Sequence, residues 1–345
     1  DRDRFVLSAG HGSMLIYSLL HLTGYEDITM AQLRKFRQIG SITAGHPEVG
    51  HAGGIETTTG PLGQGLANAV GMAMAETHMA ARYGRDLVDH FTYVIAGDGC
   101  LMEGVSHEAA SMAGHMRLGR LIVLFDDNGI SIDGSTDLAV SDDATARFAA
   151  YGWQVLAVDG HDMKAVSAAI AEARAEEDKP TLIRCQTVIG YGAPTKAGTS
   201  GAHGAPLGGD EIAGTKAALG WSHEPFEIPQ AIIDSWRAVG ARGSGARDAW
   251  QERHKAVDSS AYDAALAGDF DATVNDAIQG WKATLAADPQ KLATRVASQK
   301  ALDAIIPACP ALIGGSADLT GSNNTRARGQ DIFSRNNPAG TYVHY

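Results

Sequence analysis

The sequence is short of cysteine, of aromatic residues and of long apolar runs. Its three cysteines, Cys100, Cys185 and Cys309, are odd in number and widely spaced among 345 residues. This spacing predicts neither a disulfide framework nor a zinc site, and it favours a reducing cytoplasm as the location. No apolar run approaches the length of a membrane span, which argues against a transmembrane protein.

Positive charge is also in deficit. The formal net charge is −12 at pH 7, which argues against nucleic acid or an anionic membrane surface as a partner. Anionic ligands would therefore need local cation sites. The chain also lacks an initiator methionine and opens with charged residues directly before an expected strand. We expect that its beginning, and with it any targeting segment, is missing.

What is present is a turn-rich α/β composition, with 44% hydrophobic residues and 41 glycines. A chain of this length predicts two domains rather than one. Short apolar segments that suit buried strands alternate with segments that suit helices. The expected strands are residues 5–8, 93–96, 121–125, 154–158 and 181–189, and the expected helices are residues 14–22, 31–39, 66–82, 143–151 and 163–177. This alternation predicts a doubly wound parallel sheet.

The last third of the chain has a different character. Residues 221–288 are polar and helix-compatible, with a glycine-rich break at 240–245, and we expect them to connect to another domain. A second α/β unit is expected to open with a helix at 291–306 and a strand at 311–313.

Two glycine-containing motifs follow neighbouring expected strands. Gly97-Asp98-Gly99 comes after strand 93–96, and Asp127-Asn128-Gly129-Ile130 comes after strand 121–125. Parallel strands end at one edge of a sheet, where open α/β sheets bind their ligands. A carboxylate at this edge would repel a diphosphate unless a cation lies between them. Asp98, the amide oxygen of Asn128 and a nearby backbone carbonyl can supply the oxygen ligands that Mg²⁺ or Ca²⁺ prefers.

Other interpretations of these motifs stay open from the residues alone. Asp98 can simply cap a helix, and Asn128 can simply make a turn. Gly97-Asp98-Gly99 also looks like the first half of a dinucleotide fingerprint, with Asp126 or Asp127 as the ribose-binding acid. Met102 stands where the third glycine of that fingerprint belongs, which disfavours the dinucleotide interpretation.

Taken together, the two motifs resemble the thiamin diphosphate motif, and longer segments resemble the transketolase family in the order of that family. These segments are SAGHGSMLIYSLLHLTGY, AGHPEVGHAGGIETTTGPLGQG, AGDGCLMEGVSHEAAS, DDNGISIDG, TVIGYGAPTKAGT with HGAP, and GGSADLTGSN. The resemblance runs essentially from end to end. It implies a diphosphate-binding domain at residues 1–220, a helical linker at 221–290 and the start of a pyrimidine-binding domain at 291–345.

The resemblance also implies roles for individual residues. Asp98, Asn128 and Ile130, the last through its carbonyl, would hold the metal, which is Mg²⁺ or else Ca²⁺ or Mn²⁺. Glu103 matches a glutamate at the subunit contact near the cofactor. The residues implied to contact thiamin diphosphate are His11, Gly60, Pro61, Leu62, Gly99, Glu103, Asn128 and His203.

Substrate contacts are implied for four residues. His46 would line the substrate channel, and His46 and His203 would act in catalysis. Arg295 and Ser322 match positions that hold the sugar phosphate, a task that suits a guanidinium. His203 lies in a loop at 190–209, and loops of this length often close over a site as lids. Ser200 stands where a second histidine is often found in the family, so this chain departs from the family there.

A lone histidine in a turn or an arginine on a helix is more often structural or solvated than functional. From the residues alone, that interpretation therefore stays open for His11, His203 and Arg295. The glycines on each side of His11 favour the functional interpretation, because close approach of a ligand requires small neighbours. We also expect Ser13 to cap the helix at 14–22, which would put His11 at a positive helix end, where phosphate is stabilised.

The activity that the resemblance implies is reversible transfer of a two-carbon ketol unit from a ketose phosphate to an aldose phosphate. The expected donor is xylulose 5-phosphate and the acceptors are ribose 5-phosphate and erythrose 4-phosphate, as in the pentose phosphate pathway and the Calvin cycle. Dihydroxyacetone synthase and deoxyxylulose-phosphate synthase are the related alternatives, and a cofactor-binding polypeptide without activity is the third.

The family also implies a homodimer whose active sites are shared between subunits. The sequence stops after Tyr345, before the family segment that bears the glutamate which activates the cofactor. We therefore expect residues 1–345 alone to be inactive, and no residue of this chain is assigned to that glutamate.

Overall fold

Five parallel strands form the main sheet of the computed structural model, which describes residues 1–345. Their order is β1-β2-β3-β5-β4. The bounds are β1 Arg4–Leu7, β2 Thr92–Gly97, β3 Leu121–Asp127, β4 Gln154–Asp159 and β5 Thr181–Gln186. The predicted α/β fold with a doubly wound parallel sheet is therefore confirmed.

Contacts divide the chain into two compact units. The sheet unit comprises residues 2–74 and 90–247, and the second unit comprises residue 1 with 75–89 and 248–345. The helices that belong wholly to the sheet unit are α1 Ser13–Thr23, α2 Met30–Arg34, α4 Asp98–Met102, α5 Gly104–Met116, α6 Ala144–Ala150, α7 Met163–Ala175, α8 Gly209–Ala218 and α9 Gln230–Ala241.

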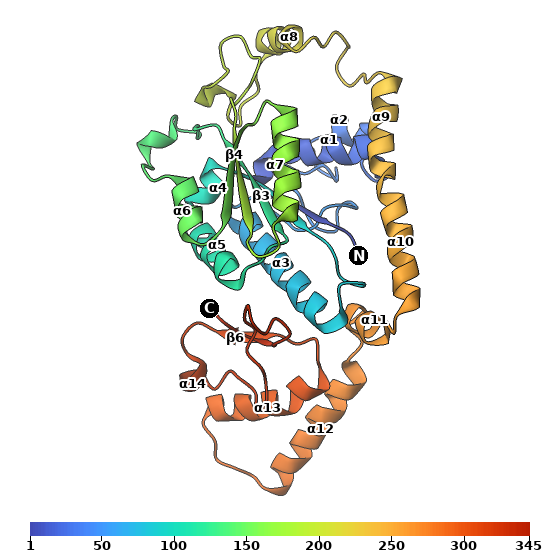
Figure 1. The fold of residues 1–345 in the computed structure, drawn as a ribbon, viewed down its shortest axis with the longest axis vertical. Helices are drawn as coiled ribbons and strands as arrows, with labels where there is room; N and C mark the ends of the chain where they lie inside the picture. The colour runs from blue at the N-terminus through green and yellow to red at the C-terminus, as the bar shows by residue number, and fades with distance from the viewer. The chain divides into compact units, whose positions relative to one another are not determined.

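Helices cover both faces of the sheet because its strands are apolar on both faces. On one face, Ile122 and Ile183 pack against Ala169 and Ala173 of α7, and Leu7 packs against Ile16 of α1. Helix α6 packs on β4 and β5, and Figure 1 shows it on the opposite side of the sheet from α7. The carboxyl ends of β2 and β3 lie next to each other at one edge of the sheet, because the two strands pair in parallel.

The second unit is mostly helical. The long helix α3 Gln64–Tyr83 and the helix α10 Gly243–Ala256 each have residues in both units. The other elements of the second unit are α11 Ser260–Ala267, α12 Asp271–Ala287, α13 Thr294–Ala308, β6 Gly314–Ser316, α14 Thr320–Asn323 and β7 Tyr342–His344. Strands β6 and β7 pair in parallel, and none of the helices of the chain is long and apolar enough to cross a membrane.

Two local expectations were wrong. The expected strand at 311–313 is not a strand, and β6 begins at Gly314. Ser13 was expected to cap α1, but Gly12 is the N-cap and Ser13 is the first helical residue. The Ser13 hydroxyl instead donates a hydrogen bond to the carbonyl of Gly45 at 2.9 Å. This bond ties the loop that carries His46 to α1.

Candidate functional site

The two predicted motifs meet at the carboxyl edge of the sheet. Gly97 ends β2 and pairs in register with Asp126 of β3, so the residues that follow lie side by side. The Asp98 Oδ2 atom accepts hydrogen bonds from the backbone N–H groups of Asn128 at 3.3 Å and Gly129 at 3.2 Å. We call Asp98, Asn128 and Ile130 the metal corner.

The oxygen atoms of Asn128 and Ile130 are oriented by local hydrogen bonds. The Asn128 side-chain N–H group donates to Asp126 Oδ2 at 3.4 Å, and its Oδ1 accepts from the Ile130 N–H at 3.0 Å. Ile130 forms an isolated antiparallel bridge with Ser135, and the neighbouring backbone groups make the hydrogen bonds of that bridge. The Ile130 carbonyl therefore points away from Ser135.

The charge around Asp98 favours a cation. Burial raises the pKa of the Asp98 carboxyl from 3.8 to about 6, and the negative charge of Asp127 adds to this effect. The N–H groups of Gly129 and Asn128 oppose the shift but do not cancel it. A half-buried carboxylate beside another carboxylate is stabilised by a positive ion.

The donor set of the metal corner therefore fits a hard divalent cation. One carboxylate, one amide oxygen and one backbone carbonyl are the oxygen types that Mg²⁺ and Ca²⁺ prefer. The chain has no cluster of three or more His, Cys, Asp or Glu side chains arranged to hold a metal. A cation here would accordingly complete its coordination with ligand or water oxygens, as Mg²⁺ commonly does in phosphate sites.

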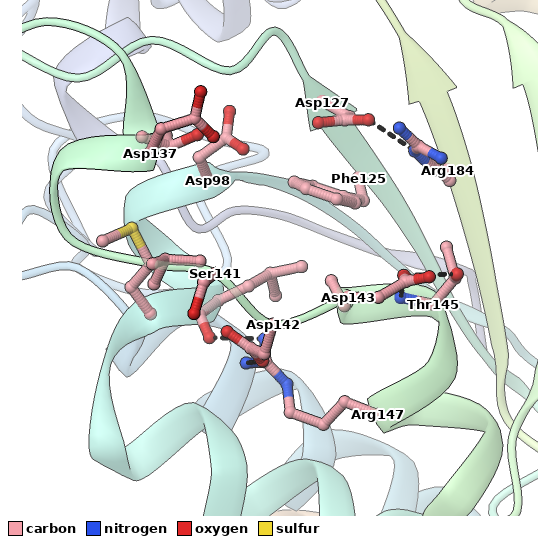
Figure 2. Close-up of a pocket in the computed structure, with 15 residues that line it drawn as sticks. Asp98, Phe125, Asp127, Asp137, Ser141, Asp142, Asp143, Thr145, Arg147 and Arg184 are labelled. Carbon is pink, nitrogen blue, oxygen red and sulfur yellow. Dashed lines mark hydrogen bonds and ion pairs between the residues drawn. The ribbon is translucent and has the colours of Figure 1, made fainter.

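A cavity of about 360 Å³ borders the metal corner on the α6 side. Figure 2 shows Asp98 at its wall, with Arg184 of β5 pointing at Asp127 of β3. Arg184 and Asp127 form an ion pair. Both lie on the same sheet face, because Arg184 is in register with Phe125 and Asp127 follows Phe125 by two residues. The cavity lining includes none of the predicted histidines, so the cavity does not define the whole site.

The predicted histidines meet in a second place, which we call the histidine corner. The rings of His11 and His203 stack with centroids 5.2 Å apart and planes at 28°. Burial lowers the pKa of His11, and the nearby His203 and His46 lower it further. His46 is positioned by Tyr17, whose hydroxyl donates to the His46 carbonyl at 3.1 Å.

Glycines allow the close packing of the histidine corner. A Cβ atom added to Gly60, whose φ is +152°, would lie 3.1 Å from Cγ of His46. A Cβ atom added to Gly10 would lie 2.6 Å from the Gly60 nitrogen and 2.7 Å from the Thr59 hydroxyl. Only glycine fits at position 10, because the backbone of residues 59–60 occupies that space.

The loop at 60–65 joins the two corners. A Cβ atom added to Gly99 would lie 2.8 Å from Leu62 Cδ1, and one added to Gly63 would lie 2.7 Å from Glu103 Cβ. Pro61 is exposed between Gly60 and Leu62. The structure thus brings the predicted cofactor residues of the sheet unit into one region, with Glu103 exposed at its edge.

The two predicted sugar-phosphate residues belong to the other unit. Arg295 lies in the first turn of α13 and Ser322 lies in α14, and both are exposed. Each is in the second unit, so their part in this site stays a prediction.

Thr59 is a residue that sequence reasoning did not single out. The hydroxyls of Thr57 and Thr58 accept hydrogen bonds from Asn68 Nδ2 and the Val49 N–H, each at 3.0 Å. The Thr59 side chain is buried, and its hydroxyl has no hydrogen-bond partner. The run of three threonines was visible in the sequence, but nothing in it separated the third from the other two.

Arg184 was also missed, although it had a visible signal. It is a charged residue inside an otherwise apolar strand, Leu182 to Cys185. A charge in such a strand needs a partner, and Asp127 provides it.

The fold is an α/β domain whose parallel sheet carries a set of oxygen donors at its carboxyl edge, which is the arrangement of domains that bind phosphate-containing cofactors. Residues 1–278 match the family model described as "Transketolase, thiamine diphosphate binding domain". The chain belongs to the transketolase family.

Similarity to individual relatives extends over the whole chain. The chain is 58% identical to a transketolase of Cereibacter sphaeroides and 52% identical to transketolase 1 of Escherichia coli, each over 100% of its length. A transketolase from Leishmania mexicana has a TM-score of 0.90 at 44% identity over 99% of this chain. One from Pichia stipitis in complex with sedoheptulose 7-phosphate has a TM-score of 0.88 at 43% identity over 99% of this chain. The chain spans about half the length of these relatives, 52% and 53% of the two curated proteins and 52% of each solved chain.

Proposed function

We propose that the protein to which this chain belongs is a transketolase, which transfers a two-carbon ketol unit between sugar phosphates. The observation that carries the proposal is the contact of the Asp98 carboxylate with the Asn128–Gly129 turn. This contact brings a carboxylate, an amide oxygen and a carbonyl close together, which supports a cation site for a diphosphate at the sheet edge. The family relationship supports the same conclusion.

Residues of the metal corner have a defined task in this proposal. Asp98, Asn128 and Ile130 bind Mg²⁺, or Ca²⁺ or Mn²⁺ in its place, and the cation neutralises the diphosphate. Gly99 and residues 60–62 let the backbone approach the cofactor closely, and Glu103 lies at a subunit contact. When bound, thiamin diphosphate supplies the carbon–carbon bond chemistry, and the protein orients its partners.

Residues of the histidine corner have a different task. His11 and His203 donate hydrogen bonds to the diphosphate, and His203 and His46 also contact the substrate and assist proton transfer. Arg295 and Ser322 hold the sugar phosphate. Xylulose 5-phosphate is the proposed donor, and ribose 5-phosphate or erythrose 4-phosphate is the acceptor.

The proposed assembly is a cytoplasmic homodimer with shared active sites. For the domains we propose the bounds that the family resemblance implies, with residues 1–220 binding the diphosphate, 221–290 as the linker and 291–345 opening the pyrimidine-binding domain. Sedimentation of the intact protein tests the dimer. An assay of the polypeptide 1–345 tests the expectation that it completes no turnover by itself.

A substrate panel tests the proposed reaction. The intact protein is supplied with thiamin diphosphate and Mg²⁺. In two reactions xylulose 5-phosphate is the donor, and the acceptor is either ribose 5-phosphate or formaldehyde. In the third reaction pyruvate is the donor and glyceraldehyde 3-phosphate is the acceptor. Formation of sedoheptulose 7-phosphate supports a transketolase. Preference for formaldehyde indicates a dihydroxyacetone synthase, and use of pyruvate indicates a deoxyxylulose-phosphate synthase. Cofactor binding without any transfer indicates a protein that only binds the cofactor.

A further inference from the structure

The loop at 190–209, which carries His203, is braced by its own backbone. The Gly198 N–H donates to the Ile189 carbonyl at 2.8 Å, which closes the first part of the loop. The Ala202 N–H donates to Thr199 at 3.1 Å, and the His203 N–H donates to Ser200 at 2.9 Å. These bonds form the short 3₁₀ turn Ser200–Ala202, which ends at His203. The loop therefore has a defined conformation near His203.

The side chain of Lys196 crosses the inside of this loop. Its Nζ atom donates to the carbonyl of Leu207 at 2.8 Å and to the carbonyl of Pro206 at 3.2 Å. Its stem passes beside Gly201, where an added Cβ atom would lie 3.8 Å from Lys196 Cγ. Lys196 thus joins the segment before the 3₁₀ turn to the segment after His203.

Glu211 of α8 holds the backbone from which Lys196 projects. Its carboxylate accepts hydrogen bonds from the N–H groups of Thr195 at 3.1 Å and Lys196 at 3.3 Å. It also accepts from the Thr195 hydroxyl. The base of the Lys196 side chain is therefore fixed to a helix, and its tip is fixed to residues 206 and 207.

The imidazole of His203 has no hydrogen bond at Nδ1 to support it. This Nδ1 atom is buried without a hydrogen-bond partner, and the ring is in contact with that of His11. The orientation of the ring therefore depends on the contact with His11 and on the backbone that carries His203. That backbone lies between the two ends of the Lys196 side chain.

We infer that Lys196 is a positioning residue, which holds His203 against His11 so that the other ring nitrogen, Nε2, faces the ligand. This inference rests on the proposed function, because the ligand of His203 is the diphosphate or the sugar phosphate of that reaction. In this role Lys196 acts on the loop and not on the ligand, because its ammonium is engaged by the carbonyls of Pro206 and Leu207. It acts by keeping residues 196–207 in one conformation, since misplacement of a catalytic group by about 1 Å can reduce a rate about 100-fold.

Three variants of the intact protein test the inference. Lys196→Met keeps the length of the side chain and removes the ammonium, and Lys196→Arg keeps a cation that can still donate to the carbonyls of residues 206 and 207. Lys216→Met is the matched control, because Lys216 also donates to a backbone carbonyl, that of His223, in the same unit.

The first measurement is amide hydrogen exchange without cofactor or substrate. We expect exchange at the N–H groups of Ala202 and His203 to be about tenfold faster or more in Lys196→Met. Lys196→Arg and Lys216→Met should exchange at these positions as the parent does. Unchanged exchange in Lys196→Met would overturn the inference, whatever reaction the protein catalyses.

The second measurement is kinetic and uses a double variant. We expect Lys196→Met to lower kcat/KM by about 10- to 100-fold, with recovery in Lys196→Arg and no effect of Lys216→Met. Adding Lys196→Met to His203→Ala should lower kcat/KM little further, because the residue to be positioned is already gone. Effects that multiply would show that Lys196 acts independently of His203, and would overturn the inference.

The two measurements also separate this inference from the proposed function. If no ketol transfer is found at all, the proposed function fails. The exchange experiment still tests whether Lys196 holds the loop at 190–209 in one conformation. If the parent transfers the ketol unit and Lys196→Met loosens the loop without changing kcat/KM, the positioning role fails by itself.

Discussion

The metal corner and the histidine corner lie in the same unit but are built in different ways. The metal corner forms where two strands that pair in register end side by side, so Gly97 and Asp126 fix the positions of the residues after them. The histidine corner joins three loops that are far apart in the sequence. It depends on bonds between side chains and backbone, such as those of Ser13 and Tyr17. Strand pairing therefore determines one corner, and loop conformation determines the other.

Loss of the Asp98 carboxylate should have the largest effect, and it tests the metal corner alone. We expect Asp98→Ala to weaken thiamin diphosphate binding by more than about 100-fold at fixed Mg²⁺, since even indirect partners of metal ligands contribute about 10- to 100-fold. Calorimetric titration measures this affinity. Asp143→Ala is the control, because Asp143 lines the same cavity but caps α6. Equal affinities of Asp98→Ala and the parent would remove the metal assignment.

Loss of the His203 imidazole tests the histidine corner. We expect His203→Ala to lower kcat/KM by about 10- to 100-fold, which corresponds to one hydrogen bond to a charged ligand. Steady-state kinetics of the intact protein measure the change, and thermal unfolding shows whether stability is altered. His51→Ala is the control, because His51 is an exposed histidine in the loop near Gly60. If both variants behave as the parent does, His203 has no role in catalysis or ligand binding.

The packing of Gly10 tests how rigid the histidine corner is. In Gly10→Ala the new methyl group would meet the Gly60 nitrogen at 2.6 Å, so we expect destabilisation of about 1–3 kcal/mol. Gly12→Ala is the control, because an added Cβ atom there has no neighbour within 4 Å. Denaturant unfolding of both variants compares them. Similar stabilities would mean that residues 59–60 move aside easily.

The smallest expected effect is a gain of stability at the metal corner. The pKa of Asp98 is raised to about 6 in the folded protein, so its ionisation destabilises the folded state as the pH rises from about 4 to about 6. Without cofactor or metal, Asp98→Asn should therefore be more stable than the parent above pH 6 and equal to it below pH 4. Because the carboxyl is partly exposed, we expect about 1 kcal/mol. Unfolding curves at pH 4 and pH 8 measure the difference, and a gain confined to pH 4 would contradict this sign.

The same contrast explains how much of the site could be predicted from the sequence. The composition of residues 93–96 and 121–125 predicts buried parallel strands, and the strand ends then bring Asp98 and Asn128 together. The stacking of His203 on His11 has no such local cause, because about 190 residues separate them and loop conformations depend on many weak contacts. Only the family resemblance predicted a role for His203, and only the structure shows that its ring stacks on His11.

Two predictions that rested on local sequence alone were wrong. Ser13 has a residue type that favours helix caps, yet its hydroxyl binds the Gly45 carbonyl instead. The Ile313 region is apolar enough for a strand, but pairing with β7 begins only at Gly314. In both cases a partner distant in the sequence decided the outcome, and local propensity does not contain that partner.

The alternation of side chains along β3 also determines which mutations in this strand preserve the metal corner. Asp127 and Asn128 point to opposite sides of the chain at the end of β3, because Asp127 pairs with Arg184 while the amide of Asn128 bonds to Asp126. Exchange of one apolar residue for another between Leu121 and Phe125 keeps this arrangement. Insertion or deletion of a single residue there reverses every side chain that follows. A deletion would place Asn128 where Asp127 now pairs with Arg184, and an insertion would place Asp127 where Asn128 now stands in the metal corner. The length of this strand therefore matters more to the metal corner than the identity of its apolar residues does.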